Sequence, residues 1–239
     1  RAIGRLLDLL DELRLADNTI VIFTSDNGPV HDRRGGTDSD FFQSAGPLRG
    51  GKGSLYEGGI RVPLIVRWPG RVAPGSVCDR VTGFEDWLPT LVEAAGGQIP
   101  PDGIDGISFL PALLGRKQAE RPFLYREFPG YGGQQSVRVG DWKLIRRNLK
   151  PGRGQEGTTP TLELYNLARD PGEENNVAET HPGMVERLLA LAREQHTPSA
   201  DFPLPALDRE AVEGDHSSHA SSQTTPALSL REGPETGTL

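Results

Sequence analysis

The sequence has little that would support a cysteine-based or membrane-spanning architecture. Its 239 residues include one cysteine, which excludes an internal disulfide framework and any metal site built from several cysteines. No apolar run approaches the roughly 20 residues that span a bilayer, so we expect no membrane span. The net charge is -7. This acidic balance argues against nucleic acid as the main partner, because phosphate neutralisation needs clustered Lys and Arg.

Glycine and proline, in contrast, are abundant. The chain has 30 Gly and 20 Pro, which is typical of a loop-rich protein, and loops often carry function. The length fits one large domain or two small ones. The chain begins at Arg1 without a signal-peptide pattern, and its first helical stretch lacks a capping residue. We therefore expect a processed form or a fragment of a longer protein.

The first half of the chain alternates helical and strand patterns. Residues 1–15 and 84–95 have apolar side chains at helical spacing. Residues 19–24 form a β-branched and aromatic run, typical of a strand buried on both faces in a parallel sheet, and residues 62–68 form a shorter run. The predicted fold class is therefore α/β, with residues 1–115 forming part of a mainly parallel sheet flanked by helices.

The second half has the pattern of a small antiparallel sheet closed by a terminal helix. Gly140-Asp141 suits a hairpin turn between two of its strands. We assign residues 116–200 to this C-terminal subdomain and residues 201–239, which become rich in small and polar residues, to a disordered tail. The predicted strands lie at residues 123–128, 136–139, 142–145 and 162–167, and the helix lies at residues 184–195.

A short polar segment, Ser25-Asp26-Asn27-Gly28, directly follows the first predicted strand. Ligands of open α/β sheets bind at the carboxyl ends of strands, so Asp26 and Asn27 lie where a site is expected. A carboxylate beside an amide carbonyl offers two hard oxygens, which suit Ca²⁺ or Mg²⁺. The alternative is an ordinary turn, because Asp-Asn-Gly is also a common turn sequence.

A glycine-rich segment carries Lys52. The glycines on either side let the backbone approach a ligand closely, and the ammonium group supplies a compact cation for an oxyanion. The spacing is not that of a phosphate-binding P-loop. A flexible loop with a solvated lysine is the alternative interpretation.

The two segments together are more specific than either alone, and they resemble the type I sulfatases of the alkaline-phosphatase-like superfamily. The resemblance covers roughly residues 1–195. Its main motifs are Asp-Asn-Gly at 26–28, Gly-Lys-Gly-Ser-Leu-Tyr-Glu-Gly-Gly-Ile-Arg-Val-Pro at 51–63 and Trp-Pro-Gly at 68–70. Supporting motifs occur in the family's order at 86–91, 105–110, 142–145, 163–167 and 170–173.

The resemblance implies roles for individual residues. Asp26 and Asn27 match the family's later pair of metal ligands, usually for Ca²⁺, with Mg²⁺ as the other candidate. Lys52 matches the lysine that contacts the sulfate group, and so is the candidate catalytic and substrate-binding residue. Sulfatases of this kind are usually periplasmic or extracellular. Glu57 and Arg61 match a recurring motif, in which we expect a loop-bracing ion pair.

The family's nucleophile is a formylglycine, made from the first residue of a Cys/Ser-x-Pro-x-Arg motif. This chain has no such motif, and Cys78 is followed by Asp-Arg-Val, which indicates an ordinary structural cysteine. We therefore expect the formylglycine upstream of Arg1. The chain alone is expected to show no turnover.

Two further features leave a choice between a functional and a structural role. His31 lies four residues after Asn27 and is a candidate substrate contact, or a histidine on a surface loop. A basic segment within residues 138–153 would either contact a sulfated polymer or form a solvated strand face. Its members are Arg138, Lys143, Arg146, Arg147, Lys150 and Arg153.

The sequence therefore predicts the C-terminal portion of a Ca²⁺-dependent sulfatase that hydrolyses sulfate esters, including those of sulfated carbohydrates. One alternative is a phosphatase or phosphodiesterase of the same superfamily, whose two-metal members need further Asp and His ligands. The other is a non-catalytic module that binds a sulfated glycan without cleaving it.

Overall fold

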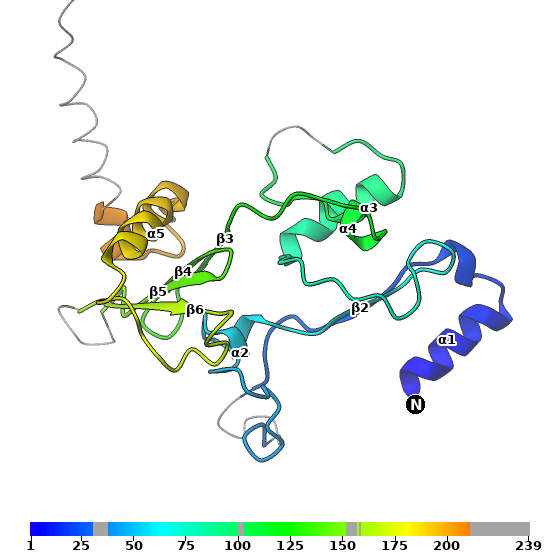
Figure 1. The fold of residues 1–239 in the computed structure, drawn as a ribbon, viewed down its shortest axis with the longest axis horizontal. Helices are drawn as coiled ribbons and strands as arrows, with labels where there is room; N and C mark the ends of the chain where they lie inside the picture. The colour runs from blue at the N-terminus through cyan, green and yellow to red at the C-terminus, as the bar shows by residue number, and fades with distance from the viewer. Residues whose placement is uncertain (31–37, 100–102, 152–156, 158, 211–239) are drawn as a thin grey trace, which may run out of the picture.

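The computed structural model describes residues 1–30, 38–99, 103–151, 157 and 159–210, whose elements fall into two successive regions of the sequence. A four-stranded sheet with its helix lies at one end of the molecule, and the N-terminal helix lies at the other (Figure 1). The first region contains α1 (Ala2–Glu12), β1 (Val21–Thr24), α2 (Glu57–Ile60), β2 (Leu64–Arg67), α3 (Trp87–Ala94) and α4 (Leu110–Leu113). The second contains β3 (Leu124–Phe128), β4 (Gln134–Val139), β5 (Trp142–Arg147), β6 (Thr161–Asn166) and α5 (Pro182–Gln195).

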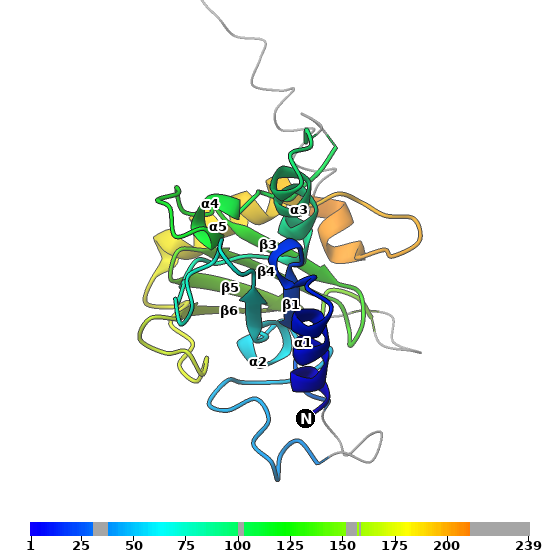
Figure 2. The same cartoon turned by 90° about the vertical axis from the view of Figure 1, so that its right-hand side faces the viewer.

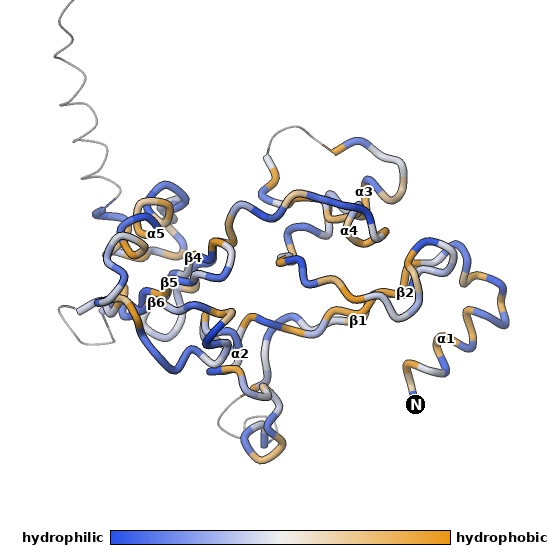
Figure 3. Tube along the Cα trace, viewed as in Figure 1, coloured by the Kyte–Doolittle hydropathy of each residue, from blue (hydrophilic) through white to orange (hydrophobic). Residues whose placement is uncertain are grey.

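The N-terminal helix α1 is amphipathic, as its sequence predicts, but none of its residues is buried. Ile3 and Leu6 are about half exposed, and only Leu7 and Leu10 of the apolar stripe are partly buried within the described residues. An ion pair of 2.8 Å between Asp11 and Arg67 connects α1 to β2. The apolar positions of α1 and β2 are visible in Figure 3. No helix in the described ranges is long and apolar enough to cross a bilayer.

Strands β1 and β2 correct the expectation of a mainly parallel sheet. They pair antiparallel, from Val21 opposite Arg67 to Thr24 opposite Leu64, and no parallel pair occurs among the described strands. Phe23 is 44% exposed, so the ribbon is not buried on both faces. The β-branched run correctly predicted a strand. Such a run does not specify the direction of the neighbouring strand. Here the neighbouring strand is formed by residues 64–67.

The second region confirms the predicted antiparallel sheet and terminal helix. Its strand order is β3-β4-β5-β6, with every neighbouring pair antiparallel. The β4–β5 hairpin turns at Gly140-Asp141, where Gly140 takes a left-handed φ of 55° that suits glycine. The helix α5 packs on the sheet, as the two views show (Figures 1 and 2). The core joins Val137, Leu144 and Leu164 to Leu188 and Ala192.

The packed part of the chain continues past residue 200. Although the sequence predicts a tail from residue 201, Leu204 and Leu207 are buried and form a small core with Leu149. Glu210 pairs with the buried Arg146. Residues 201–210 therefore belong to the folded chain, while the rest of the predicted tail lies outside the described residues.

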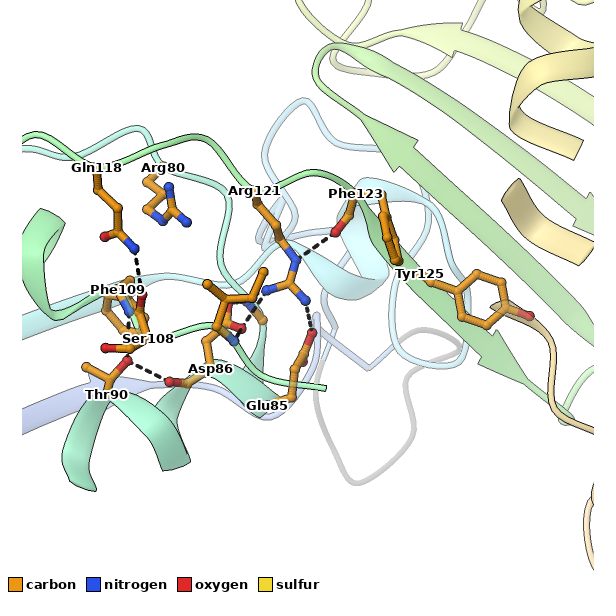
Figure 4. A network of polar contacts seen from close by, with 12 residues as sticks. Arg80, Glu85, Asp86, Thr90, Ser108, Phe109, Gln118, Arg121, Phe123 and Tyr125 are labelled. Atoms are coloured by element: carbon orange, nitrogen blue, oxygen red, sulfur yellow. Dashed lines mark hydrogen bonds and ion pairs between the residues drawn. The ribbon is translucent and has the colours of Figure 1, made fainter. Parts of the chain in front are cut away.

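A buried carboxylate organises the region around α3. Asp86 accepts hydrogen bonds from the backbone N–H groups of Gly83 and Ile107, at 2.9 and 2.8 Å, and forms an ion pair with Arg121. Figure 4 shows the Arg121 guanidinium pointing toward both Asp86 and Glu85. The motif at residues 86–91 is therefore structural in this fold, since it connects α3 to the segment that leads into β3.

Candidate active site

Asp26, Asn27 and Lys52 line one cavity of about 1480 Å³. Asp26 and Asn27 directly follow β1, and Lys52 lies in the glycine-rich loop before α2. The structure thus brings together three of the four predicted site residues from two separate segments. The fourth, His31, lies outside the described residues.

Two backbone hydrogen bonds hold the segments together. The N–H of Gly28 donates to the carbonyl of Gly59 at 2.9 Å, and the N–H of Lys52 donates to the carbonyl of Pro29 at 2.8 Å. The hydroxyl of Ser25 donates to the Asn27 carbonyl at 2.8 Å and shapes the turn. Because both backbone bonds are made by the two residues directly after Asn27, the turn and the lysine loop form one local unit.

Glycine at position 28 is required by this close approach. A Cβ atom added to Gly28 would lie 1.8 Å from the carbonyl oxygen of Gly58, far inside any normal contact distance. Gly58 itself packs under the Arg49 and Gly50 carbonyls, where an added Cβ would lie 2.5 Å from either oxygen. The glycines of the two motifs therefore let α2 and the Asp-Asn-Gly turn pack backbone to backbone.

The side chain of Gln134, at the start of β4, fastens the lysine loop to the C-terminal sheet. Its Nε2 atom donates to the carbonyl of Gly53 at 2.8 Å, and its Oε1 atom accepts from the N–H of Leu55 at 3.2 Å. Gln134 is buried. One amide therefore satisfies a donor and an acceptor on the chain immediately after Lys52.

A buried group of charges reinforces this attachment. Lys143 on β5 lies 2.8 Å from Glu57 and 2.9 Å from Glu173, and all three side chains are almost completely buried. Glu173 also accepts a hydrogen bond of 2.6 Å from the backbone N–H of Glu57. Glu57 does brace the loop, but its close partner is Lys143, because Arg61 is half exposed and 3.8 Å away. Burial raises the pKa of Glu173, and the Lys143 charge opposes that rise.

A second carboxylate, Glu163 on β6, receives several donors. The hydroxyls of Tyr56 and Tyr165 donate to it at 2.6 and 2.8 Å, and Arg147 pairs with it at 2.9 Å. Burial raises the pKa of Glu163, but these hydrogen bonds and the charges of Arg147 and Arg49 outweigh burial, so the pKa lies below its ordinary value. Burial and the bond to Glu163 raise the pKa of Tyr165 to about 12.

These contacts correct both interpretations of the basic segment, which is neither a free surface for a sulfated polymer nor a solvated strand face. Lys143 and Arg146 are buried, and Arg147 is only partly exposed. Arg138 lies 3.8 Å from Glu57, and Arg153 lies outside the described residues. At positions 143, 146 and 147 the positive charge therefore neutralises carboxylates of the chain itself. A lysine amid apolar residues, Trp142-Lys143-Leu144-Ile145, is the sequence signal for its burial.

The donor set of the site suits a hard divalent cation in part. Asp26 and Asn27 line the cavity and carry a carboxylate and an amide carbonyl. No group of three or more His, Cys, Asp or Glu side chains with metal-site geometry occurs in the ranges that the structure describes. Ca²⁺ takes about six to eight oxygens, so most of its ligands would come from elsewhere. Cys78, which also lines the cavity, is exposed, so it is not a buried structural residue.

Comparison with known proteins defines the class. The sequence matches two family models, one described as Sulfatase over residues 1–97 and one described as N-sulphoglucosamine sulphohydrolase, C-terminal, over residues 51–195. The chain belongs to the type I sulfatase family, with its alkaline-phosphatase-like fold.

Individual relatives agree with this assignment. The chain is 36% identical to N-acetylgalactosamine-6-O-sulfatase of Bacteroides thetaiotaomicron, over 79% of this chain and 38% of that protein. It is 36% identical to arylsulfatase A of Homo sapiens, over 80% of this chain and 40% of that protein. The chain thus spans about two fifths of the length of these curated relatives.

Solved structures also share the fold. One, a complex with its substrate D-glucosamine-2-N,6-O-disulfate, superposes with a TM-score of 0.62 at 28% identity, covering 80% of this chain and 37% of the other. A phosphonate monoester hydrolase of Agrobacterium radiobacter superposes with a TM-score of 0.56 at 27% identity, covering 81% and 38%.

Proposed function

We propose that this chain is the C-terminal portion of a Ca²⁺-dependent sulfatase, which hydrolyses a sulfate ester to an alcohol and free sulfate. One observation carries the proposal: two backbone hydrogen bonds bring the Asp26-Asn27 turn and the Lys52 loop into one cavity. The pairing of a cation site with an ammonium group fits a sulfate ester, whose leaving oxygen and sulfate oxygens carry negative charge during transfer. Membership of the sulfatase family supports the same chemistry.

Each residue has a separate task in this proposal. The Asp26 carboxylate and the Asn27 side-chain carbonyl bind the cation, and Asp26 also balances part of its charge. A bound divalent cation polarises sulfate oxygens and orients an attacking group. Lys52 stabilises negative charge on the sulfate oxygens from a fixed position, because its loop is fastened at Gly53 and Leu55.

No residue of this chain fits the formylglycine nucleophile, because the sequence holds no Cys/Ser-x-Pro-x-Arg motif. The proposal therefore assigns turnover to the full-length protein and none to the 239-residue chain alone. In this proposal the chain binds the cation, binds the sulfate group and holds the lysine loop in place.

The test measures hydrolysis of para-nitrophenyl sulfate by the full-length protein, with Ca²⁺ and after its removal by a chelator. We expect Lys52→Ala to lower kcat by about 100-fold or more, as loss of a transition-state donor usually does. Asp26→Ala should raise the Ca²⁺ concentration needed for half-maximal rate. Lys117→Ala is the matched control, since Lys117 is exposed and does not line the cavity. Equal rates in Lys52→Ala and wild type would refute the proposal.

A second candidate, a phosphatase or phosphodiesterase of the same superfamily, is favoured by the structural likeness to a phosphonate monoester hydrolase. The same full-length protein should be assayed with para-nitrophenyl phosphate and bis-para-nitrophenyl phosphate. Faster hydrolysis of either ester than of the sulfate would replace the first proposal with this one.

The third alternative, a non-catalytic glycan-binding module, loses one of its two supports. The basic segment has members at positions 143, 146 and 147 that pair with Glu57, Glu210 and Glu163. A glycan would have to displace these internal partners in order to bind there.

A further inference from the structure

The loop between β3 and β4 presents an exposed aromatic ring beside Lys52. Tyr131 is 62% exposed and lines the same cavity as Lys52. A Cβ atom added at Gly53 would lie 2.4 Å from Cε2 of Tyr131, so the ring covers the backbone of the residue next to Lys52. The ring therefore lies against the chain position that directly follows Lys52, and both residues line the cavity.

The backbone holds Tyr131 in a conformation that residues other than glycine rarely adopt. Its φ is 50°, and the two glycines that follow, Gly132 and Gly133, have φ values of 84° and 77°. A non-glycine residue in this region carries strain, which persists where the surrounding structure imposes it and which is concentrated at ligand sites. The loop is closed by a hydrogen bond of 3.0 Å from the N–H of Gly133 to the carbonyl of Gly130.

One contact of the ring and one of its loop constrain this position further. The ring of Phe128, at the end of β3, lies 6.0 Å from that of Tyr131 between centroids, with an angle of 35° between the planes. Gln134, three residues after Tyr131, bonds to Gly53 and Leu55 and so ties the aromatic loop to the lysine loop. The position of Tyr131 relative to Lys52 is therefore set by the fold.

We propose that Tyr131 determines specificity by stacking against the pyranose ring of a sugar whose sulfate is held at Lys52. The inference rests on the proposed sulfatase function. One face of a pyranose carries mainly C–H groups, which match the flat apolar ring of tyrosine, while the tyrosine hydroxyl stays available to polar groups. An aryl sulfate carries no pyranose ring, so it is the ligand that should not depend on this stacking, and the test compares the two.

The experiment measures kcat and KM of the full-length protein for a sulfated hexosamine and for para-nitrophenyl sulfate. Tyr131→Ala should lower kcat/KM for the sulfated hexosamine about tenfold or more, chiefly through KM, and change that for the aryl sulfate less than about twofold. Tyr131→Phe, which keeps the ring, should retain activity on both. Phe202→Ala removes a similarly exposed ring outside the cavity and should change neither.

Unchanged kcat/KM for the hexosamine in Tyr131→Ala would overturn the inference. Equal losses on both substrates would also overturn it and indicate that the ring only positions the lysine loop. A loss confined to the aryl sulfate would assign the ring to flat aromatic substrates instead. If the wild type hydrolyses neither ester, the proposed function fails by itself. Calorimetric titration with the sulfated hexosamine then decides, because equal affinity of wild type and Tyr131→Ala refutes the role of Tyr131.

Discussion

The Nζ atom of Lys143 lies 2.8 Å from a carboxylate oxygen of Glu57, and both side chains are almost completely removed from water. Lys143 belongs to the C-terminal sheet, whereas Glu57 begins the short helix that follows the lysine loop. The pair therefore links the sheet to the site.

Replacement of Lys143 by methionine should lower the free energy of unfolding by about 3–5 kcal/mol, because it leaves Glu57 and Glu173 buried without their cation. Methionine keeps most of the side-chain volume, so the loss reports charge and not a cavity. Urea unfolding of the 239-residue chain measures the effect, with the exposed Lys117→Met as control. Equal losses in the two variants would contradict the buried pair.

Gly28→Ala should lower the free energy of unfolding by about 1–3 kcal/mol, since the added methyl group meets the backbone of Gly58 and no rotamer can relieve the contact. Gly4→Ala is a matched control in α1, where an added Cβ has no atom within 4 Å. That change should stabilise the helix slightly, by up to about 1 kcal/mol. Thermal unfolding of both variants checks the prediction. Wild-type stability in Gly28→Ala would show that the turn does not pack against α2 as described.

Gln134→Leu should loosen the lysine loop, because the N–H of Leu55 loses its buried acceptor. An unsatisfied buried group costs about 1–3 kcal/mol, so exchange of the Leu55 amide hydrogen should accelerate about tenfold or more. Gln118 provides the control, because its side chain also accepts a hydrogen bond from a backbone N–H, that of Ala112, and donates one to a backbone carbonyl, that of Ser108. Gln118→Leu should accelerate exchange at Ala112 and leave Leu55 protected. Faster exchange at Leu55 in Gln118→Leu but not in Gln134→Leu would be incompatible with the Gln134 contacts.

Stability should fall as pH drops below the ordinary carboxyl range, in part because of Glu163. Its pKa in the folded chain lies below the ordinary value of 4.5, so the folded state binds that proton less readily than the unfolded state. Its stabilising contribution is therefore complete above that value and is lost as pH falls through the folded pKa. Glu163→Gln should show less change in unfolding free energy between about pH 5 and pH 3 than wild type. Parallel pH profiles for the two chains would disprove the assignment.

The local elements of this chain follow closely from its sequence. Helical spacing over residues 1–15 and 184–195 and the four strand patterns after residue 120 correspond to α1, α5 and the antiparallel sheet. These elements depend on side-chain period and turn residues, which are local properties. The short helix α2 escaped prediction because two of its four residues are glycine, and its conformation depends on contacts with Arg49 and Gly28.

The sequence predicts which motif residues belong to the candidate site, but it does not predict how they are arranged in space. The motifs indicate Asp26, Asn27 and Lys52, yet Gln134 and Tyr131 come from a loop and strand about 80 residues further along. Their side chains reach the site only through the tertiary fold, and neither residue belongs to a local chemical pattern. Ion pairs between residues far apart in the sequence, such as Lys143 and Glu57, likewise cannot be predicted from the spacing of residues along the chain.

The contacts of Gln134, Lys143 and Glu173 with residues 53–57 also bear on how such proteins can recombine. Residue 115 lies between two regions of different composition. A recombination crossover there would nevertheless separate the lysine loop from the side chains that hold it. A chimera between relatives should keep its lysine loop in place only when both parental segments carry matching partners. The loop and the distant sheet residues are therefore expected to be inherited together, as one unit of exchange.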